Sequence, residues 1–329
     1  MILAGDIGGT KTNLAYFSAE SGKLVRKQLQ SYPSRDFKSL KDVLAKFQAD
    51  FPSAVMAAAF GIAGPVVNGR SKLTNLGWDV VGSDIASHLN LTQVGLLNDL
   101  EATAYGALRL DPKEYLVLNK GVAAEKGTIA VIAAGTGLGE GGLHWDGKRY
   151  RTIASEGGHT DFGPRDETEI DLLRFLKPKY GRVSYERVVA GPAIIDLYDF
   201  LRKQSDEPEP EWLKLALTSG DPSAVISKAG LEMRDKVSAQ TLDMFASLYG
   251  AEAGNLALKI LATGGVFVGG GIAPKILPKI QDGSFFSSFK NKGRYEGLMK
   301  NIPIWIILND QTALLGAAHY AELILTESL

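Results

Sequence analysis

Short apolar runs that end in glycine-rich turns recur along the chain and predict β-strands. Residues 2–17 hold two such runs on either side of a glycine-rich tip, which is typical of a β-hairpin. Residues 128–134 form another apolar run, followed by the glycine-rich stretch 135–142 and a second hairpin pattern around Asp146 and Gly147. Because the pattern of strand, glycine tip and strand occurs in both halves of the chain, we expect two related α/β units.

Helical periodicity appears between these strands. Apolar residues at helical spacing predict amphipathic helices at 37–47, 100–108 and 310–325. The uncharged stretch 51–69 is long enough to resemble a membrane span, but prolines and glycines interrupt it, so it predicts a buried strand that ends in a turn. The acidic, proline-containing segment 205–211 predicts a surface loop.

Composition limits the classes of protein that fit. The chain has 329 residues, which favours two domains; 45% are hydrophobic, 22% are charged and the net charge is −1. This balance argues against disorder and against a nucleic-acid partner. There is no cysteine, which excludes a disulfide scaffold, a thiolate metal site and a thiol nucleophile. The first residues lack a basic segment, so we expect no signal peptide and a cytoplasmic protein.

Four glycine-rich tips follow apolar strands, at 5–12, 61–65, 135–142 and 269–271. Glycine lets a ligand approach backbone N–H groups closely, which phosphate binding requires. The P-loop pattern fails because Thr10, not glycine, precedes Lys11. The spacing of glycines in 137–142 fits a dinucleotide fingerprint, but a strand pattern follows it where that fingerprint needs a helix.

We therefore expect hairpin tips from both domains to bind the phosphates of a nucleotide. The predicted nucleotide-binding residues are Gly8, Gly9, Thr10 and Lys11 in the first tip, Thr136 and Gly137 in the second, and Gly269, Gly270 and Gly271 beneath the nucleoside. Asp6 could hold Mg²⁺ directly or through water, because Mg²⁺ prefers carboxylate and water oxygens.

A second group of polar residues favours a neutral ligand. It comprises Asn98, Asp99, Glu156, His159 and Glu186. Few cations accompany these residues, so a polyol fits better than an anion, since carboxylates and an amide can hydrogen-bond vicinal hydroxyls. Metal binding by Glu156 and His159 is the alternative, but no second nearby histidine completes a zinc set. His88, His144 and His319 are expected to be surface or satisfied core residues, and Glu101 and Asp161 could equally be structural charges.

An ordered set of motifs carries a family resemblance over nearly the whole chain. In order, these are GDIGGTKTNLA, GIAGP, TNLGWDV, LLNDLEATAYG, AAGTGLGEGGL, SEGGHTDFGPR, SYERVVAGP, GGVFVGGGIAPKIL and the segment from FKNKGRYEG to NDQTALLGAA. The set resembles the bacterial glucokinase family of the sugar kinase, actin and heat-shock ATPase superfamily.

The resemblance implies a fold and a reaction. It implies an α/β protein with two ribonuclease-H-like (actin-like ATPase) domains and a ligand cleft between them, divided as 1–110 plus 311–329 and 111–310. The implied reaction is ATP-dependent phosphorylation of D-glucose to D-glucose 6-phosphate with Mg²⁺, the first step of glycolysis. By motif position, Asp99 matches the catalytic base, and Asn98, Glu156, His159 and Glu186 match the sugar contacts. A homodimer is also implied, with no nucleic-acid or membrane partner.

Two alternatives stay open from the sequence. Lys11-Thr12 after the first glycine tip is also seen in the related repressor/kinase family, which phosphorylates fructose, mannose or N-acetylated sugars. That family usually carries a cysteine-rich zinc motif, which this chain lacks. The other alternative is a non-catalytic, actin-like ATP-binding sensor, which would not need Glu156, His159 and Glu186.

Overall fold

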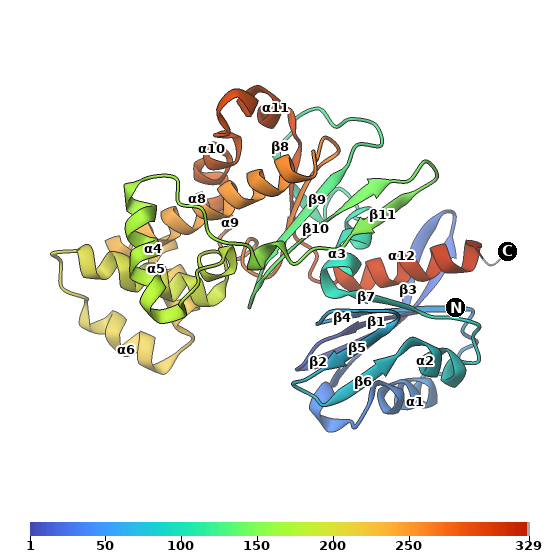
Figure 1. Ribbon diagram of the computed structural model, residues 1–329. Helices are drawn as coiled ribbons and strands as arrows, with labels where there is room; N and C mark the ends of the chain where they lie inside the picture. The colour runs from blue at the N-terminus through green and yellow to red at the C-terminus, as the bar shows by residue number, and fades with distance from the viewer. Residues whose placement is uncertain (328–329) are drawn as a thin grey trace. The chain divides into compact units, whose positions relative to one another are not determined.

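A computed structural model describes residues 1–327 and divides into two compact units. Unit 1 consists of Met1–Glu114 together with the described residues from Asn309 onward, and unit 2 is the continuous segment Tyr115–Leu308. The boundaries expected from the sequence, after residues 110 and 310, differ from these by four residues and by two. Figure 1 colours the chain from one end to the other.

Unit 1 contains a five-stranded mixed sheet. Its first three strands form an antiparallel meander, and two further strands are added in parallel to the first strand. In spatial order the strands are β3 (Lys23–Pro33), β2 (Lys11–Glu20), β1 (Ile2–Ile7), β4 (Ala57–Ile62) and β7 (Gly95–Asn98). β2 is antiparallel to both of its neighbours, whereas β1, β4 and β7 run parallel. The expected first hairpin is therefore confirmed as β1 and β2.

Helices cover both faces of this sheet because its strands are apolar on both sides (Figure 1). Leu3 and Ile7 pack in one core with α1 (Leu40–Asp50) and α2 (Gly82–Leu89). Ile2 and Ala4 face the opposite way and pack against α12 (Thr312–Glu327). The short hairpin of β5 (Arg70–Leu73) and β6 (Trp78–Val81) completes the first core.

Two glycines bring α12 unusually close to α3 (Asp99–Ala107). A Cβ on Gly316 would collide with the carbonyl oxygen of Ala102, and one on Gly106 would collide with that of Thr312. Any larger residue at either position would push the helices apart, so these glycines fix how α3 lies in unit 1.

Unit 2 repeats the strand order of unit 1. Its sheet runs β11 (Tyr150–Ile153), β10 (Leu138–Trp145), β9 (Ile129–Ala134), β12 (Gly265–Gly269), β13 (Ile304–Ile307) and β8 (Tyr115–Asn119). β9, β10 and β11 form an antiparallel meander, and β9, β12 and β13 are parallel, as in unit 1. β8 adds an antiparallel edge strand. The expected repeat of two related α/β units is confirmed.

The long helix α8 (Lys236–Lys259) is the centre of the helical layer of unit 2 (Figure 1). Its Phe245 and Tyr249 are fully buried with Phe285 and Phe289, which lie in α10 (Ser284–Lys290). The other helices of unit 2 are α4 (Glu167–Tyr180), α5 (Gly191–Gln204), α6 (Glu211–Ser219), α7 (Pro222–Leu231), α9 (Leu277–Gln281) and α11 (Glu296–Asn301). The expected surface loop connects α5 and α6.

Element ends differ from the sequence expectations where a local cap decides them. The helix expected at 37–47 begins at Leu40, because the Ser39 hydroxyl accepts a hydrogen bond from the backbone N–H of Asp42 at 3.3 Å. The glycine stretch 137–142 runs into β10, as expected, so the dinucleotide fingerprint is excluded.

Among the helices of residues 1–327, none is long and apolar enough to span a membrane.

Candidate active site

Asn98 and Asp99 lie where β7 passes directly into α3. Asn98 is the N-cap: its Oδ1 accepts from the backbone N–H of Glu101 at 2.6 Å, and Glu101 Oε2 accepts from the N–H of Asn98 at 3.0 Å. This capping box leaves the Asn98 amide nitrogen as a donor toward a ligand. Asp99 is exposed in the first turn of the helix, where the helix dipole favours negative charge.

The first glycine tip joins β1 to β2 and is hydrogen-bonded by Ser34. The Ser34 hydroxyl is fully buried and donates to the carbonyl oxygen of Gly8 at 2.7 Å, and it lies 3.0 Å from the Thr12 hydroxyl. The N–H of Ser34 donates to the carbonyl oxygen of Thr10 at 3.0 Å. Thr12 is thus a structural residue of the tip, while Thr10 and Lys11 are exposed.

Asp6 lies at the end of β1, at the same edge of the sheet as Asn98. In the parallel register Asp6 is level with Gly61 of β4, and Ile62 is level with Asn98 of β7. Burial raises the pKa of the Asp6 carboxyl group, and a hydrogen bond of 3.3 Å from Asn13 Nδ2 opposes this rise.

The surroundings of Asp6 fit Mg²⁺ only in part. No group of three or more His, Cys, Asp or Glu residues in the described part of the chain is arranged to hold a metal ion. Mg²⁺ commonly binds one or two carboxylates together with substrate phosphates and water. A single carboxylate next to a glycine-rich tip fits that mode and does not fit a metal site made by protein alone.

The segment from Glu156 to His159 is a short 3-10 turn, η2 (Gly157–His159), that lies directly on β10. A Cβ on Gly158 would collide with the carbonyl oxygen of Leu138, and one on Gly157 with the carboxyl group of Glu140. The two glycines therefore allow the turn to rest on the strand. Glu156 and His159, at its two ends, are both exposed.

Glu186 lies against the second glycine tip. It belongs to the 3-10 turn η3 (Tyr185–Arg187), and its Oε2 accepts from the backbone N–H of Leu138 at 3.1 Å. A Cβ on Gly137 would lie only 2.5 Å from the same oxygen. The other oxygen, Oε1, is 4.0 Å from His159 Nδ1. The structure thus brings His159, Glu186 and Gly137 together within unit 2.

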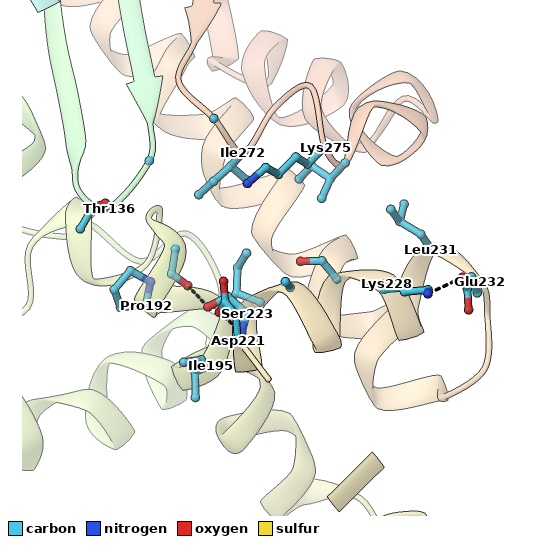
Figure 2. Close-up of a pocket in the computed structure, with 17 residues that line it drawn as sticks. Thr136, Pro192, Ile195, Asp221, Ser223, Lys228, Leu231, Glu232, Ile272 and Lys275 are labelled. Carbon is cyan, nitrogen blue, oxygen red and sulfur yellow. Dashed lines mark hydrogen bonds and ion pairs between the residues drawn. The ribbon is translucent and has the colours of Figure 1, made fainter. Parts of the chain in front are cut away.

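A cavity of about 1020 Å³ opens beside Thr136 (Figure 2). Figure 2 shows Ile272 and Lys275 on one side of it and Pro192, Asp221 and Ser223 on another. The residues that line it are Gly135, Thr136, Gly191, Pro192, Ile194, Ile195, Asp221, Ser223, Ala224, Ser227, Lys228, Leu231, Glu232, Gly271, Ile272, Lys275 and Ile276.

The lining of this cavity suits a nucleotide. Isoleucine and leucine side chains offer an apolar wall for a base, and Lys228 and Lys275 bring positive charge, although Lys228 lies 3.9 Å from Glu232. Gly191 begins the 14-residue helix α5, whose N-cap, Ala190, provides no side-chain hydrogen bond. The N–H of Gly191 donates to the carbonyl oxygen of Gly135 at 2.8 Å and Pro192 has no N–H, so the start of α5 favours phosphate through the helix dipole.

Of the residues predicted to bind nucleotide in unit 2, only Thr136 and Gly271 line the cavity. Gly270 instead forms the turn after β12 with φ of 80°, and a Cβ there would collide with the carbonyl oxygen of Ala134. Gly269 is buried at the end of β12. The fully buried Tyr249 ties the two strand ends together, because its hydroxyl accepts from the N–H of Ala134 at 3.1 Å and lies 3.2 Å from the carbonyl oxygen of Gly269.

The residues left open by the sequence have structural partners. Glu101 completes the capping box, and Asp161 forms an ion pair of 2.8 Å with Arg182. His319 is buried in α12, where its Nδ1 accepts from Arg109 Nε at 3.1 Å.

Sequence comparison with known families gives a match over almost the whole chain. The model of the family described as Glucokinase matches residues 3–324. A glucokinase from Nostoc sp. is 44% identical, with 97% of this chain and 98% of the relative covered. A glucokinase from Synechocystis sp. is 43% identical, with 96% of each chain covered.

Solved structures agree with the sequence comparison. A glucokinase from an Antarctic psychrotroph is 30% identical, covers 98% of both chains and superposes with a TM-score of 0.86. A ROK family glucokinase from Streptomyces griseus, in complex with glucose and AMPPNP, shares the fold with a TM-score of 0.65 at 21% identity, covering 98% of this chain and 99% of its own. These neighbours confirm the expected class of two actin-like α/β units. With the family model matching from residue 3 to residue 324, the chain belongs to the glucokinase family.

Proposed function

We propose that this protein transfers the γ-phosphoryl group of ATP to the 6-hydroxyl of D-glucose. The observation that carries the proposal is Asp99, an exposed carboxylate fixed by the Asn98 capping box at the start of α3, in a chain of the glucokinase family. Asp99 Oδ1 accepts from the backbone N–H of Leu100 at 2.9 Å, and an exposed carboxylate at a helix start can accept a proton from a bound hydroxyl.

Asp99 acts as the general base. Its carboxylate takes the proton of the sugar hydroxyl as that oxygen attacks the γ-phosphorus in line, and the bond from phosphorus to the ADP oxygen breaks. Little covalent chemistry is required of the protein, so alignment of the two substrates and stabilisation of charge supply most of the rate.

We assign Asn98, Glu156, His159 and Glu186 to the hydroxyls of glucose. In unit 2, His159 and Glu186 lie within 4.0 Å of each other, so they can share adjacent hydroxyls of one ring. An epimer would leave one of these polar groups without its partner, which gives selectivity among hexoses.

The cavity next to Thr136 is proposed to hold ATP, with the base against Ile195 and Ile272 and the phosphates toward Thr136 and the start of α5. Gly8, Gly9, Thr10, Lys11 and Gly137 are proposed to contribute N–H groups or charge to the phosphates. Mg²⁺, held by ATP phosphates and by Asp6 directly or through water, would neutralise the phosphate charge.

We also propose that the protein is a cytoplasmic homodimer.

The test measures formation of the sugar phosphate with glucose, and then with fructose, mannose and N-acetylglucosamine, using ATP, ADP or polyphosphate as donor. Glucose with ATP should give the highest kcat/KM. A preference for another hexose would favour the repressor/kinase relatives, and ATP binding without turnover on any hexose would favour the sensor.

Asp99→Asn tests the base directly. The variant should lose at least about 100-fold in kcat, since general-base catalysis contributes that much, while its Kd for glucose changes little. Asp84→Asn is the matched control, because Asp84 is also exposed in the first turn of a helix of unit 1. Unchanged kcat in Asp99→Asn would remove Asp99 from this role.

A further inference from the structure

A pair of buried carboxyl groups lies beneath the sugar-binding segments of unit 2. Glu140 in β10 is 1% exposed, and its carboxyl group reaches the backbone of Gly157, between Glu156 and His159. Within residues 1–327, no hydrogen-bond donor reaches either oxygen of this carboxyl group. A buried carboxylate without a donor is strongly disfavoured, so the neutral acid is the form that suits this position.

Glu252 in α8 is the neighbouring carboxyl group. It is fully buried, and its charge acts on Glu140. Its Oε1 accepts from Lys259 Nζ at 3.1 Å, and its Oε2 accepts from Asn255 Nδ2 at 2.8 Å. Glu252 therefore has two donors, one of them a cation, while Glu140 has none. A proton carried by Glu140 would give Glu252 a third donor.

The same network reaches the second sugar-binding segment through Tyr185. Asn255 Nδ2 also donates to the Tyr185 hydroxyl at 2.9 Å, and Tyr185 directly precedes Glu186. Burial and the charge of Glu252 raise the pKa of Tyr185 to about 12, so its hydroxyl stays protonated at neutral pH. Glu252 thus neighbours Glu140, which contacts Gly157, and through Asn255 it is linked to Tyr185 at the start of η3.

Burial and the charge of Glu252 raise the pKa of Glu140 to about 8, because two adjacent carboxylates in a buried site repel each other. Lys292 Nζ donates to Asn255 Oδ1 at 2.6 Å, and burial lowers the pKa of Lys292 to about 8. The titratable groups that face the pair or its partners are Lys259, Lys292, Arg165, Glu169, Tyr185 and Tyr249.

The geometry points to Glu140 as a positioning residue for sugar binding: its protonated carboxyl group donates to Glu252 and supports Gly157, which holds Glu156 and His159 toward the sugar. The inference rests on the proposed function, because it takes Glu156 and His159 as sugar contacts. When Glu140 loses its proton, its repulsion with Glu252 displaces the support of Gly157. Glucose binding then weakens while the phosphoryl-transfer groups are untouched.

The experiment measures the Kd and KM for glucose and the kcat from pH 6.5 to 9.5 in the full chain. In the unmodified protein, Kd for glucose should rise by up to about tenfold for each pH unit above the titration of Glu140. Glu140→Gln keeps a neutral donor of the same size, so its Kd at pH 7 should stay within about twofold and lose most of this rise.

Glu140→Ala and one control complete the set. Glu140→Ala removes both the donor and the support of Gly157, so KM for glucose should rise about tenfold with kcat changed less than threefold. Asp196→Asn alters another buried carboxylate of unit 2, paired with Lys179, and should change stability without changing KM for glucose. Infrared spectroscopy at pH 7 should show a protonated carboxyl band that disappears in Glu140→Gln.

The outcomes separate the two claims. If the unmodified protein phosphorylates no hexose and binds no glucose, the proposed function and this inference both fail. If it phosphorylates glucose but Glu140→Gln keeps the full pH dependence of Kd, or the infrared band is absent, the inference alone is overturned. Should Glu140→Ala fail to fold, the Gln variant and the spectrum still decide.

Discussion

At the scale of single residues, burial decides which charged groups serve the fold and which are available to a ligand. His319 illustrates the first kind. Burial and the Arg109 guanidinium lower the pKa of its imidazole to about 3, and its Nδ1 accepts from Arg109, so the neutral ring carries its proton on Nε2. His159, by contrast, is exposed beside Glu186, where a ligand can reach it.

His319 makes the fold sensitive to acid. Its pKa is below the value of about 6.5 expected in the unfolded chain, so between pH 6.5 and 3 the unfolded chain binds a proton that the folded chain does not. Stability should therefore fall as pH falls through this window, by about 2 kcal/mol from pH 7 to pH 5 from this group. Urea unfolding at pH 7 and pH 5 measures it.

His319→Gln keeps an acceptor for Arg109 and should remove most of that loss. The exposed His144 provides the control, since His144→Gln should leave the acid loss as it is. An equal loss of stability in His319→Gln and in the unmodified protein would contradict the assignment.

At the scale of elements, the junction between β7 and α3 sets the position of the proposed base. The capping box joins Asn98 to Glu101 by two hydrogen bonds, and Asp99 lies between them. Glu101→Ala removes one of these bonds, so it should lower stability by about 1 kcal/mol and also lower kcat, because Asp99 is less firmly held.

Glu101→Gln should restore both quantities, because a glutamine carbonyl can accept from the N–H of Asn98. Chemical denaturation and ADP release, measured on the same preparations, give the comparison. If Glu101→Ala lost stability but kept full kcat, the cap would support the helix without positioning Asp99.

The sequence was informative where the signal is local. Short apolar runs and glycine tips predicted the hairpins of both sheets, and the run into Asn98 and Asp99 placed the start of α3 within one residue. The sequence could also have revealed the capping box, because Asn98 and Glu101 are three residues apart, which is the spacing of that motif. Contacts between distant segments carry no such signal.

Three features show what could not be predicted. Ser34, which directly follows β3, donates to Gly8 in the first glycine tip. Glu140 of β10 lies next to Glu252 of α8. The nucleotide cavity gathers Ile195, Ser223 and Ile272 from three separate segments. Each depends on how elements pack after they form, which local periodicity does not encode.

At the scale of the whole molecule, the cavity proposed to hold ATP is lined by residues of unit 2. If the cavity binds ATP, the ligand should stabilise the folded full chain by about 2.7 kcal/mol at 100 times its Kd. Ala224→Trp fills the cavity wall and should abolish the rise in Tm on adding ATP.

Leu215→Trp adds the same side chain at an exposed position of α6 and should keep the full shift. Calorimetry of both variants with and without ATP makes the comparison. If Ala224→Trp kept the full rise in Tm on adding ATP, the nucleotide would bind elsewhere in the chain.

The insertion of unit 2 within unit 1 has a consequence for biosynthesis. Unit 2 is one uninterrupted segment, so every strand and helix it needs leaves the ribosome in succession. The sheet of unit 1 is made first, yet the helix that packs against Ile2 and Ala4, α12, is made only after all of unit 2. During translation that apolar face has no cover of its own, and a chaperone or a slow ribosome at that stage should affect the yield of unit 1 before that of unit 2.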